Sequence, residues 1–245
     1  MNKFLILLLA ALLALGLFTT ACGNDDDDDN NNPQDAVWAV GIASIGAKDG
    51  SHGVTVSWVG EAAAYVEPSS LVLEIGGDPI TLGDHYNQFW MGETNLTPGQ
   101  EYNVKLTVNN DVKCNTTLKT AYEATGDFPA DYSPASAATV TWTLSSNNQK
   151  QYATATSFSP VKYSNDSFSE EISASARSFT FPAGAVDDFG NMTSYTLSID
   201  QMNTKTVDGV MLIASQSTHA NYTSFAKEAR QARQEDFLRL VGLLR

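Results

Sequence analysis

Basic residues are scarce in this chain. Its 245 residues include 14 lysines and arginines against 28 acidic residues, and the formal net charge is −14. Nucleic-acid-binding proteins carry a clustered basic surface, which this composition does not provide. An acidic body is also repelled by anionic lipid headgroups. The composition therefore excludes nucleic acid as a partner, and any attachment to a membrane must rest on something other than surface charge.

Cysteine is rarer still, with only Cys22 and Cys114 present. A disulfide between the two is one arrangement that they allow. Cys114 alternates with Val112, Thr116 and Leu118 along one face of an expected strand, which favours a small buried side chain over a reactive thiol. Cys22 lies directly after an apolar segment, and this position indicates a different use.

Motifs for catalysis and cofactor binding are missing as well. The chain has no glycine-x-serine-x-glycine elbow and no phosphate-binding glycine loop, and its three histidines do not have metal-ligand spacing. Neighbouring carboxylates such as Glu170 and Glu171 would point to opposite faces of a strand. We therefore expect no catalytic residue, no metal and no cofactor, and a protein that is not an enzyme.

The first 21 residues have the pattern of an export signal. Met1–Lys3 is positively charged and Phe4–Phe18 is apolar and uncharged. This run is shorter than the ~20 residues that span a bilayer, but it suits the apolar region of a secretory signal. Small residues then lead to Cys22. The arrangement resembles a bacterial lipoprotein signal, although Thr19 stands where that family usually has leucine. The alternative is an ordinary secretory signal cut nearby.

The resemblance implies that residues 1–21 are a signal peptide and that Cys22 carries acyl chains such as palmitate. Each buried methylene contributes ~0.8 kcal/mol, so several chains hold a soluble domain on a membrane. Residues 22–35 then form a flexible acidic tether, because five adjacent aspartates repel each other. The acidic run resembles the surface-export signals of some Gram-negative lipoproteins. We expect a lipid-anchored envelope protein, sorted to the outer membrane and exposed at the cell surface.

Residues 36–121 alternate between apolar and polar positions, as half-buried strands do. Trp58 ends one such strand, and Tyr102 begins another. The corner before Tyr102 reads leucine-x-proline-glycine-x-x-tyrosine. This stretch resembles a fibronectin type III domain. The resemblance implies that Trp58 and Tyr102 belong to a sandwich core and that the Tyr102 hydroxyl bonds to nearby backbone, as in a tyrosine corner.

The pattern recurs over residues 135–221, after an expected linker at 122–134. Trp142 occupies the place of Trp58, and Tyr195 occupies that of Tyr102. The second copy lacks the proline-glycine corner, so a generic immunoglobulin-like sandwich is the alternative there. The fold prediction is all-β: two consecutive antiparallel β-sandwiches of the fibronectin type III or immunoglobulin-like kind, followed by a C-terminal amphipathic helix.

Residues 222–245 differ in composition from the rest of the chain. Four of the five arginines fall in the last sixteen residues, and Phe237, Leu240, Val241 and Leu244 recur at helical spacing. We expect an amphipathic helical tail. Three explanations compete for it: docking on the second sandwich, binding to a membrane or a partner helix, or a foreign sequence at the end of the chain.

The strongest recognition candidate is the segment Asp84–Thr94, which gathers Tyr86, Phe89 and Trp90. Phe89 and Trp90 must face opposite ways on a strand, so one of them is expected in the core. An exposed Trp90 beside Tyr86 would make an aromatic platform for a sugar ring. The alternative is that both rings cap the sandwich.

Two functional hypotheses follow. The first is a non-catalytic, lipid-anchored envelope protein that acts as a structural or protein-interaction module, with an envelope or extracellular protein as its partner. The second is a glycan-binding surface lipoprotein that uses the aromatic patch around Trp90.

Overall fold

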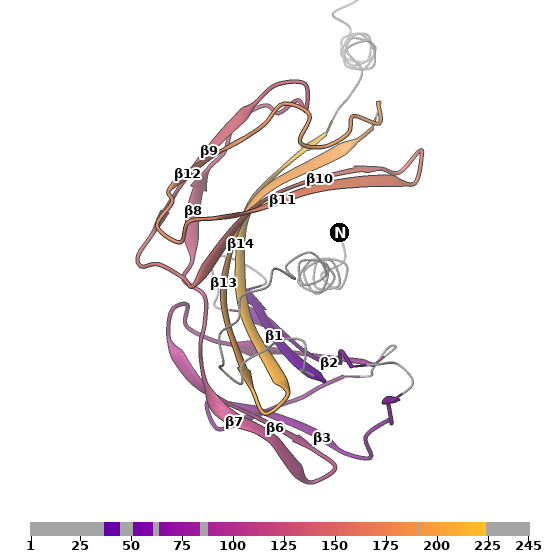
Figure 1. Ribbon diagram of the computed structural model, residues 1–245, viewed down its shortest axis with the longest axis vertical. Coiled ribbons are helices and arrows are strands. Elements are labelled where there is room, and N and C mark those ends of the chain that lie inside the picture. Colours follow the sequence, from indigo (N-terminus) through magenta and orange to yellow (C-terminus); the bar gives the residue numbers. More distant parts are fainter. Residues whose placement is uncertain (1–36, 45–50, 61–63, 84–87, 191, 224–245) are drawn as a thin grey trace, which may run out of the picture. The chain divides into compact units, whose positions relative to one another are not determined.

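The computed structural model describes residues 37–44, 51–60, 64–83, 88–190 and 192–223. Within those ranges the elements are the strands β1 to β14, which confirms the all-β prediction (Figure 1). The described part of the chain holds no helix that is long and apolar enough to cross a membrane. The predicted C-terminal helix, the signal peptide and the tether lie outside the described residues.

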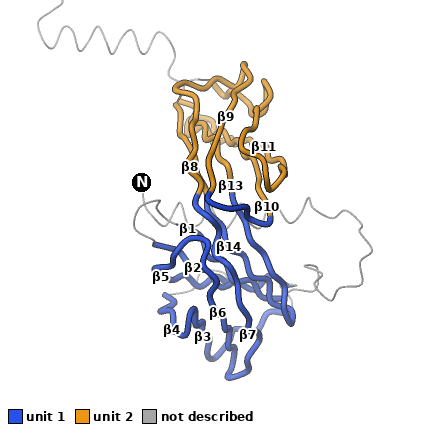
Figure 2. Tube along the Cα trace, turned by 90° about the vertical axis from the view of Figure 1, so that its left-hand side faces the viewer, with its two compact units in different colours: residues 1–123, 145–149, 201–216 blue, residues 124–144, 150–200, 217–245 orange. Residues whose placement is uncertain are grey.

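The chain divides into two compact units, and neither is one continuous stretch of sequence (Figure 2). Unit 1 comprises residues 1–123, 145–149 and 201–216. Unit 2 comprises residues 124–144, 150–200 and 217–245. The long strands β13 (Ser194–Val207) and β14 (Val210–Thr223) therefore supply residues to both units.

Unit 1 is a sandwich of two β-layers. In the first layer β1 (Trp38–Ser44), β2 (Ser51–Trp58) and β5 (Phe89–Asn95) pair antiparallel in that order. The second layer has the antiparallel order β4 (Asp78–Ile80), β3 (Leu71–Ile75), β6 (Glu101–Val108) and β7 (Asp111–Lys119). Two facing β-layers of this kind are the architecture of immunoglobulin-like and fibronectin type III-like sandwiches.

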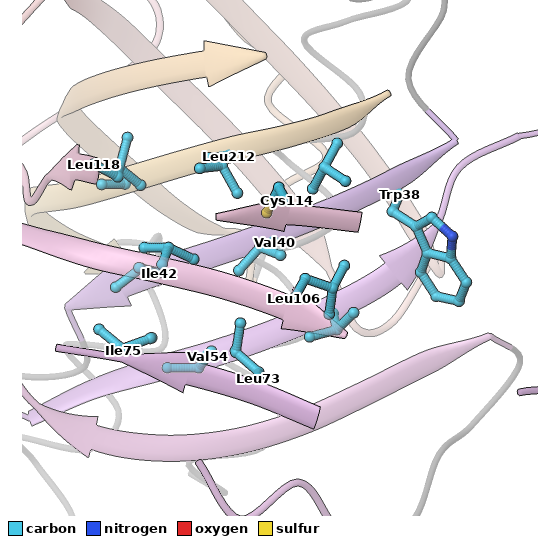
Figure 3. Close-up of a cluster of buried hydrophobic side chains, with 14 of the residues drawn as sticks. Trp38, Val40, Ile42, Val54, Leu73, Ile75, Leu106, Cys114, Leu118 and Leu212 are labelled. Atoms are coloured by element: carbon cyan, nitrogen blue, oxygen red, sulfur yellow. The ribbon is translucent and has the colours of Figure 1, made fainter. Parts of the chain in front are cut away.

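The two layers of unit 1 enclose a common core. In β6 the alternation places Val104, Leu106 and Val108 inside. They pack with side chains of the facing layer, such as Val40 and Val54, as Figure 3 shows for this cluster. Valine and leucine suit this half-buried, pleated surface, and each fully buried side chain contributes about 1.5–3 kcal/mol.

A strand from late in the sequence completes this core. The first part of β14 pairs parallel with β1, with Val40 opposite Leu212. Val210, Leu212 and Ala214 are buried in the same cluster as β1 and β6 (Figure 3). We expected this segment to close the second sandwich within residues 135–221, whereas its residues 210–216 belong to unit 1.

Buried amides hold the short segment 145–149 in unit 1. The Asn148 Oδ1 atom accepts a hydrogen bond from the Tyr122 N–H at 2.8 Å. The Asn148 Nδ2 atom donates to Gln201 Oε1 at 3.1 Å, and Asn203 Oδ1 accepts from the Gln149 N–H at 2.9 Å. A buried amide is costly when unpaired, so this network fixes the segment against the β13 residues of the same unit.

Unit 2 is a second β-sandwich. One layer has the order β12 (Ser178–Phe181), β9 (Ala138–Leu144) and β8 (Ala124–Asp127). The other has the order β11 (Ser164–Ile172), β10 (Lys150–Ser159) and β13, followed by β14. The buried side chains between them include Val140, Trp142, Phe181, Tyr195 and Leu197.

The expected linker 122–134 contains structure that belongs to unit 2. Its β8 pairs antiparallel with β9, and the Tyr132 ring lies edge-on to Tyr195 with centroids 5.7 Å apart. The expected tail also begins too early, because β14 continues to Thr223 and the Tyr222 hydroxyl donates to the Pro129 carbonyl at 2.8 Å. Prolines and acidic residues around β8 masked this short strand in the sequence.

The parallel pairing of β14 gives a first prediction. Leu212→Ala should destabilise unit 1 by about 2–5 kcal/mol, because the substitution leaves a cavity in a packed core. The measurement is the rate at which the buried Cys114 thiol of the same core is alkylated, followed by mass spectrometry of its peptide. Leu212→Ala should accelerate that reaction at least as much as Leu106→Ala does. An unchanged rate would show that β14 does not support the unit 1 core.

Candidate interaction site

Trp90 does not form part of an exposed platform. Trp90 is only 8% exposed and belongs to the core of unit 1. Its ring lies 5.9 Å from the ring of Trp38, which in turn meets Trp58 edge-on at 5.3 Å. Phe89 is half-buried, and Tyr86 lies outside the described residues. Trp90 is therefore not the exposed ring that the glycan hypothesis requires, because it packs against Trp38 of β1 in the core of unit 1.

The four residues named for the sandwich cores lie at comparable places in the two units. Trp142 and Tyr195 are buried in the core of unit 2, and Trp58 and Tyr102 are half-buried against the core of unit 1. They serve packing and hydrogen bonding within each unit.

Tyr102 closes the corner that the leucine-proline-glycine motif forms. Its hydroxyl accepts a hydrogen bond from the Thr97 N–H at 2.9 Å. Gly99 between them has a φ of 75°, a left-handed conformation that glycine adopts without steric cost. A Cβ atom at Gly99 would also overlap the ring of Tyr122. This geometry is that of a tyrosine corner.

Trp142 is oriented by a buried glutamine that the sequence analysis did not single out. The Trp142 Nε1–H donates to Gln151 Oε1 at 2.9 Å. The Gln151 amide nitrogen donates to the Ser173 carbonyl at 2.9 Å and also bonds the Ala174 carbonyl. One fully buried side chain therefore links the core tryptophan to the loop after β11. This chemistry is structural, because all of its hydrogen-bonding groups are used within the unit.

Cys114 is a buried thiol rather than a reactive one. Its side chain is 1% exposed in the core of unit 1. Burial, the largest cause, raises the pKa of the thiol, a bond to the Leu106 backbone lowers it, and the charge of Asp208 raises it. At neutral pH the thiol therefore stays protonated, and the thiol is a poor nucleophile compared with the thiolate.

Unit 2 exposes several large apolar side chains on neighbouring segments. In the described ranges eight large apolar side chains are exposed, and four of them lie near the end of β10, in the β10–β11 turn and in the loop before β13. These four make up what we term the tip patch: Phe158 (47% exposed), Val161 (65%), Tyr163 (88%) and Met192 (51%). The other four are all valines of unit 1.

The backbone of the tip patch is strained at two positions. Tyr163 has a φ of 50° and Met192 a φ of 66°, both in the left-handed region. Bulky side chains are uncommon there, where glycine or asparagine fits at lower cost. Strained residues of this kind concentrate at functional sites. The tip patch thus combines exposed apolar side chains with turns that are not optimised for stability.

Hydrogen bonds hold the two loops of the tip patch together. The Ser194 Oγ–H donates to the Phe158 carbonyl at 3.3 Å, and the Asp187 N–H donates to Asp166 Oδ2 at 2.9 Å. Asp188 Oδ1 accepts from the Tyr195 hydroxyl at 2.7 Å. The loops are therefore anchored to strands β10, β11 and β13 of the same sandwich (Figure 1). Binding loops on a rigid scaffold have this construction.

Comparison with known proteins gives little beyond the fold. No family model and no curated protein matches the chain. Among solved structures, the chain is similar to the FN1–FN3 domains of chicken CNTN1, with 11% identity and a TM-score of 0.29 over 77% of this chain and 63% of that one. It is also similar to dimeric latent PorU from Porphyromonas gingivalis, with 10% identity and a TM-score of 0.26 over 77% of this chain and 20% of that one.

These two matches cover less than two thirds of the neighbouring chains. We draw no functional argument from similarities this low. The assignment of the chain to the all-β, fibronectin type III-like class rests on the strand pairing and the two cores described above.

The role of Gln151 can be tested directly. Gln151→Leu should destabilise unit 2 by about 1–3 kcal/mol, because it leaves the Trp142 N–H and the Ser173 carbonyl without their buried partner. Urea unfolding followed by tryptophan fluorescence measures the loss. Asn115→Ala, which removes only an exposed amide contact, is the control and should change stability by less than about 0.5 kcal/mol. Equal effects of the two substitutions would contradict the structural role of Gln151.

Proposed function

We propose that this chain is a non-catalytic structural or protein-interaction module, held at the cell envelope by a lipid on Cys22. The observation that carries the interaction role is the tip patch. Monomeric soluble proteins keep contiguous exposed apolar surface small, and such surface commonly marks an interaction site. The tip patch displays four exposed apolar side chains on anchored loops of one β-sandwich.

The polar chemistry in the interior is consistent with a scaffold. The side chains of Gln151 and Asn148 form hydrogen bonds with strands and loops of their own units. The Tyr102 hydroxyl does the same. Such fully paired buried groups rigidify a core. Rigidity of this kind suits a module that presents loops at fixed positions to a partner.

The lipid anchor is supported by the sequence alone. The apolar run Phe4–Phe18, the small residues before Cys22 and the acidic stretch after it suit an acylated amino terminus on a tether. Because the chain is strongly acidic, hydrocarbon rather than charge must hold it on an anionic membrane. We propose the outer membrane as the location, with the sandwiches displayed at the cell surface.

The anchor gives the next prediction. The chain expressed in a bacterium with lipoprotein processing should begin at Cys22, and mass spectrometry of its first peptide should show the added mass of fatty acyl chains. Cys22→Ser should release the protein into the soluble fraction or leave the signal uncut. A mature chain that begins elsewhere and carries no lipid would contradict the anchor while leaving the interaction role open.

The interaction role is tested in the intact envelope. A photo-crosslinking residue at position 163 should give a discrete covalent adduct with one protein, identified by mass spectrometry and verified by reciprocal tagging of that protein. The same residue at position 112, an exposed site in unit 1, is the control and should not give that adduct. The absence of any specific adduct from either position would contradict a protein-interaction module.

A further inference from the structure

Charge at the tip patch indicates what kind of partner it takes. The two loops carry the carboxylates of Asp166, Asp187 and Asp188 against one ammonium group, that of Lys162. Asp187, Asp188 and Lys162 are exposed, and Asp166 is half-buried. The two loops that carry the tip patch therefore have a net negative charge. This charge repels anionic lipid headgroups and other anionic surfaces.

Two of these carboxylates, those of Asp166 and Asp188, also help to fix the loops. Asp166 Oδ2 accepts from the Asp187 N–H, and Asp188 Oδ1 accepts from both the Tyr195 hydroxyl and the Gly190 N–H. A sugar ligand needs hydrogen-bonding groups that are available beside an open aromatic face. Two of the four apolar side chains of the tip patch, Val161 and Met192, are aliphatic, which suits an apolar side chain better than a sugar ring.

From these observations we propose that the tip patch binds a protein segment whose apolar centre is flanked by lysine or arginine. The apolar centre packs on Tyr163, Val161 and Met192, and the basic flanks face Asp187 and Asp188. Aromatic anchors surrounded by complementary charge are the usual composition of an interface hot spot. This inference rests on the proposed interaction role and adds the site and the chemistry of the partner.

Because the backbone at residue 163 is strained, one substitution can change binding without lowering stability. Asparagine tolerates the left-handed conformation of residue 163 better than tyrosine does. Tyr163→Asn should therefore keep or raise the melting temperature while it removes the most exposed ring of the patch. If Tyr163 had only a structural role, its substitution would not weaken binding while the melting temperature stayed the same or rose.

The experiment is selection of a phage-displayed library of random 12-residue peptides on the immobilised full chain. The enriched peptides should carry an apolar centre with at least two lysines or arginines. Their affinity, measured with synthetic peptides, should fall at least about tenfold on the double variant Val161→Ser/Tyr163→Asn. It should fall a few-fold on Asp187→Asn, and also on raising the salt concentration, because the charge contribution is screened.

The matched control is Val72→Ser/Val112→Ser, which removes exposed apolar side chains from unit 1. It should bind the selected peptides as the unchanged chain does, and circular dichroism should show all variants folded. Peptides that bind the tip variant undiminished would overturn the tip patch as the site but leave the proposed function standing. Selected peptides without basic residues would overturn the chemistry of the partner. Failure to enrich any peptide, with binding to phosphatidylcholine vesicles or a glycan array instead, would overturn both proposals.

Discussion

The parallel pairing of β1 with β14 is the constraint on which the rest of the structure depends. It joins the first described strand to the last one, with Val40 opposite Leu212 in the core of unit 1. Without β14, the edge of β1 would present unpaired backbone groups, and the core would lose three buried side chains. Because the partner strands lie so far apart in sequence, unit 1 cannot be completed until nearly all of the described chain is available. Non-local pairings of this kind slow folding and couple early and late segments.

In both units buried amide side chains are hydrogen-bonded within the fold. Strained backbone conformations are instead found at exposed turns. Gln151 fixes Trp142 and a neighbouring loop, and Asn148 fixes residues 145–149. Tyr163 and Met192 instead hold bulky side chains in left-handed conformations at exposed turns. A chain selected only for stability would place glycine or asparagine there. The contrast is consistent with the interaction role that we propose for the tip patch.

Much of the fold is predictable from local pattern, whereas its connectivity is not. Strict alternation identified the strands around Trp58, Tyr102 and Trp142. The sequence analysis did not predict that the first part of β14 belongs to unit 1. The uninterrupted apolar run Val210–Ala214 is nevertheless typical of a strand that is buried on both faces. The sequence left open which of Phe89 and Trp90 lies in the core, because alternation fixes opposite faces but not which face has a partner; the structure places Trp90 there. The tip patch had a local signal, a valine and a tyrosine in a proline-initiated turn, but only the three-dimensional structure shows the Ser194–Phe158 hydrogen bond that joins the start of β13 to the end of β10.

Native-state hydrogen exchange of the β14 amides tests the central claim most directly. If β14 completes unit 1, the amides of residues 210–214 should exchange as slowly as those of β1 and β6, because all three strands open only when the common core opens. If the β14 amides exchanged many-fold faster than the amides of β1 and β6, β14 would be a peripheral strand that the core does not need. The account of how the two units are built from one chain would then be wrong.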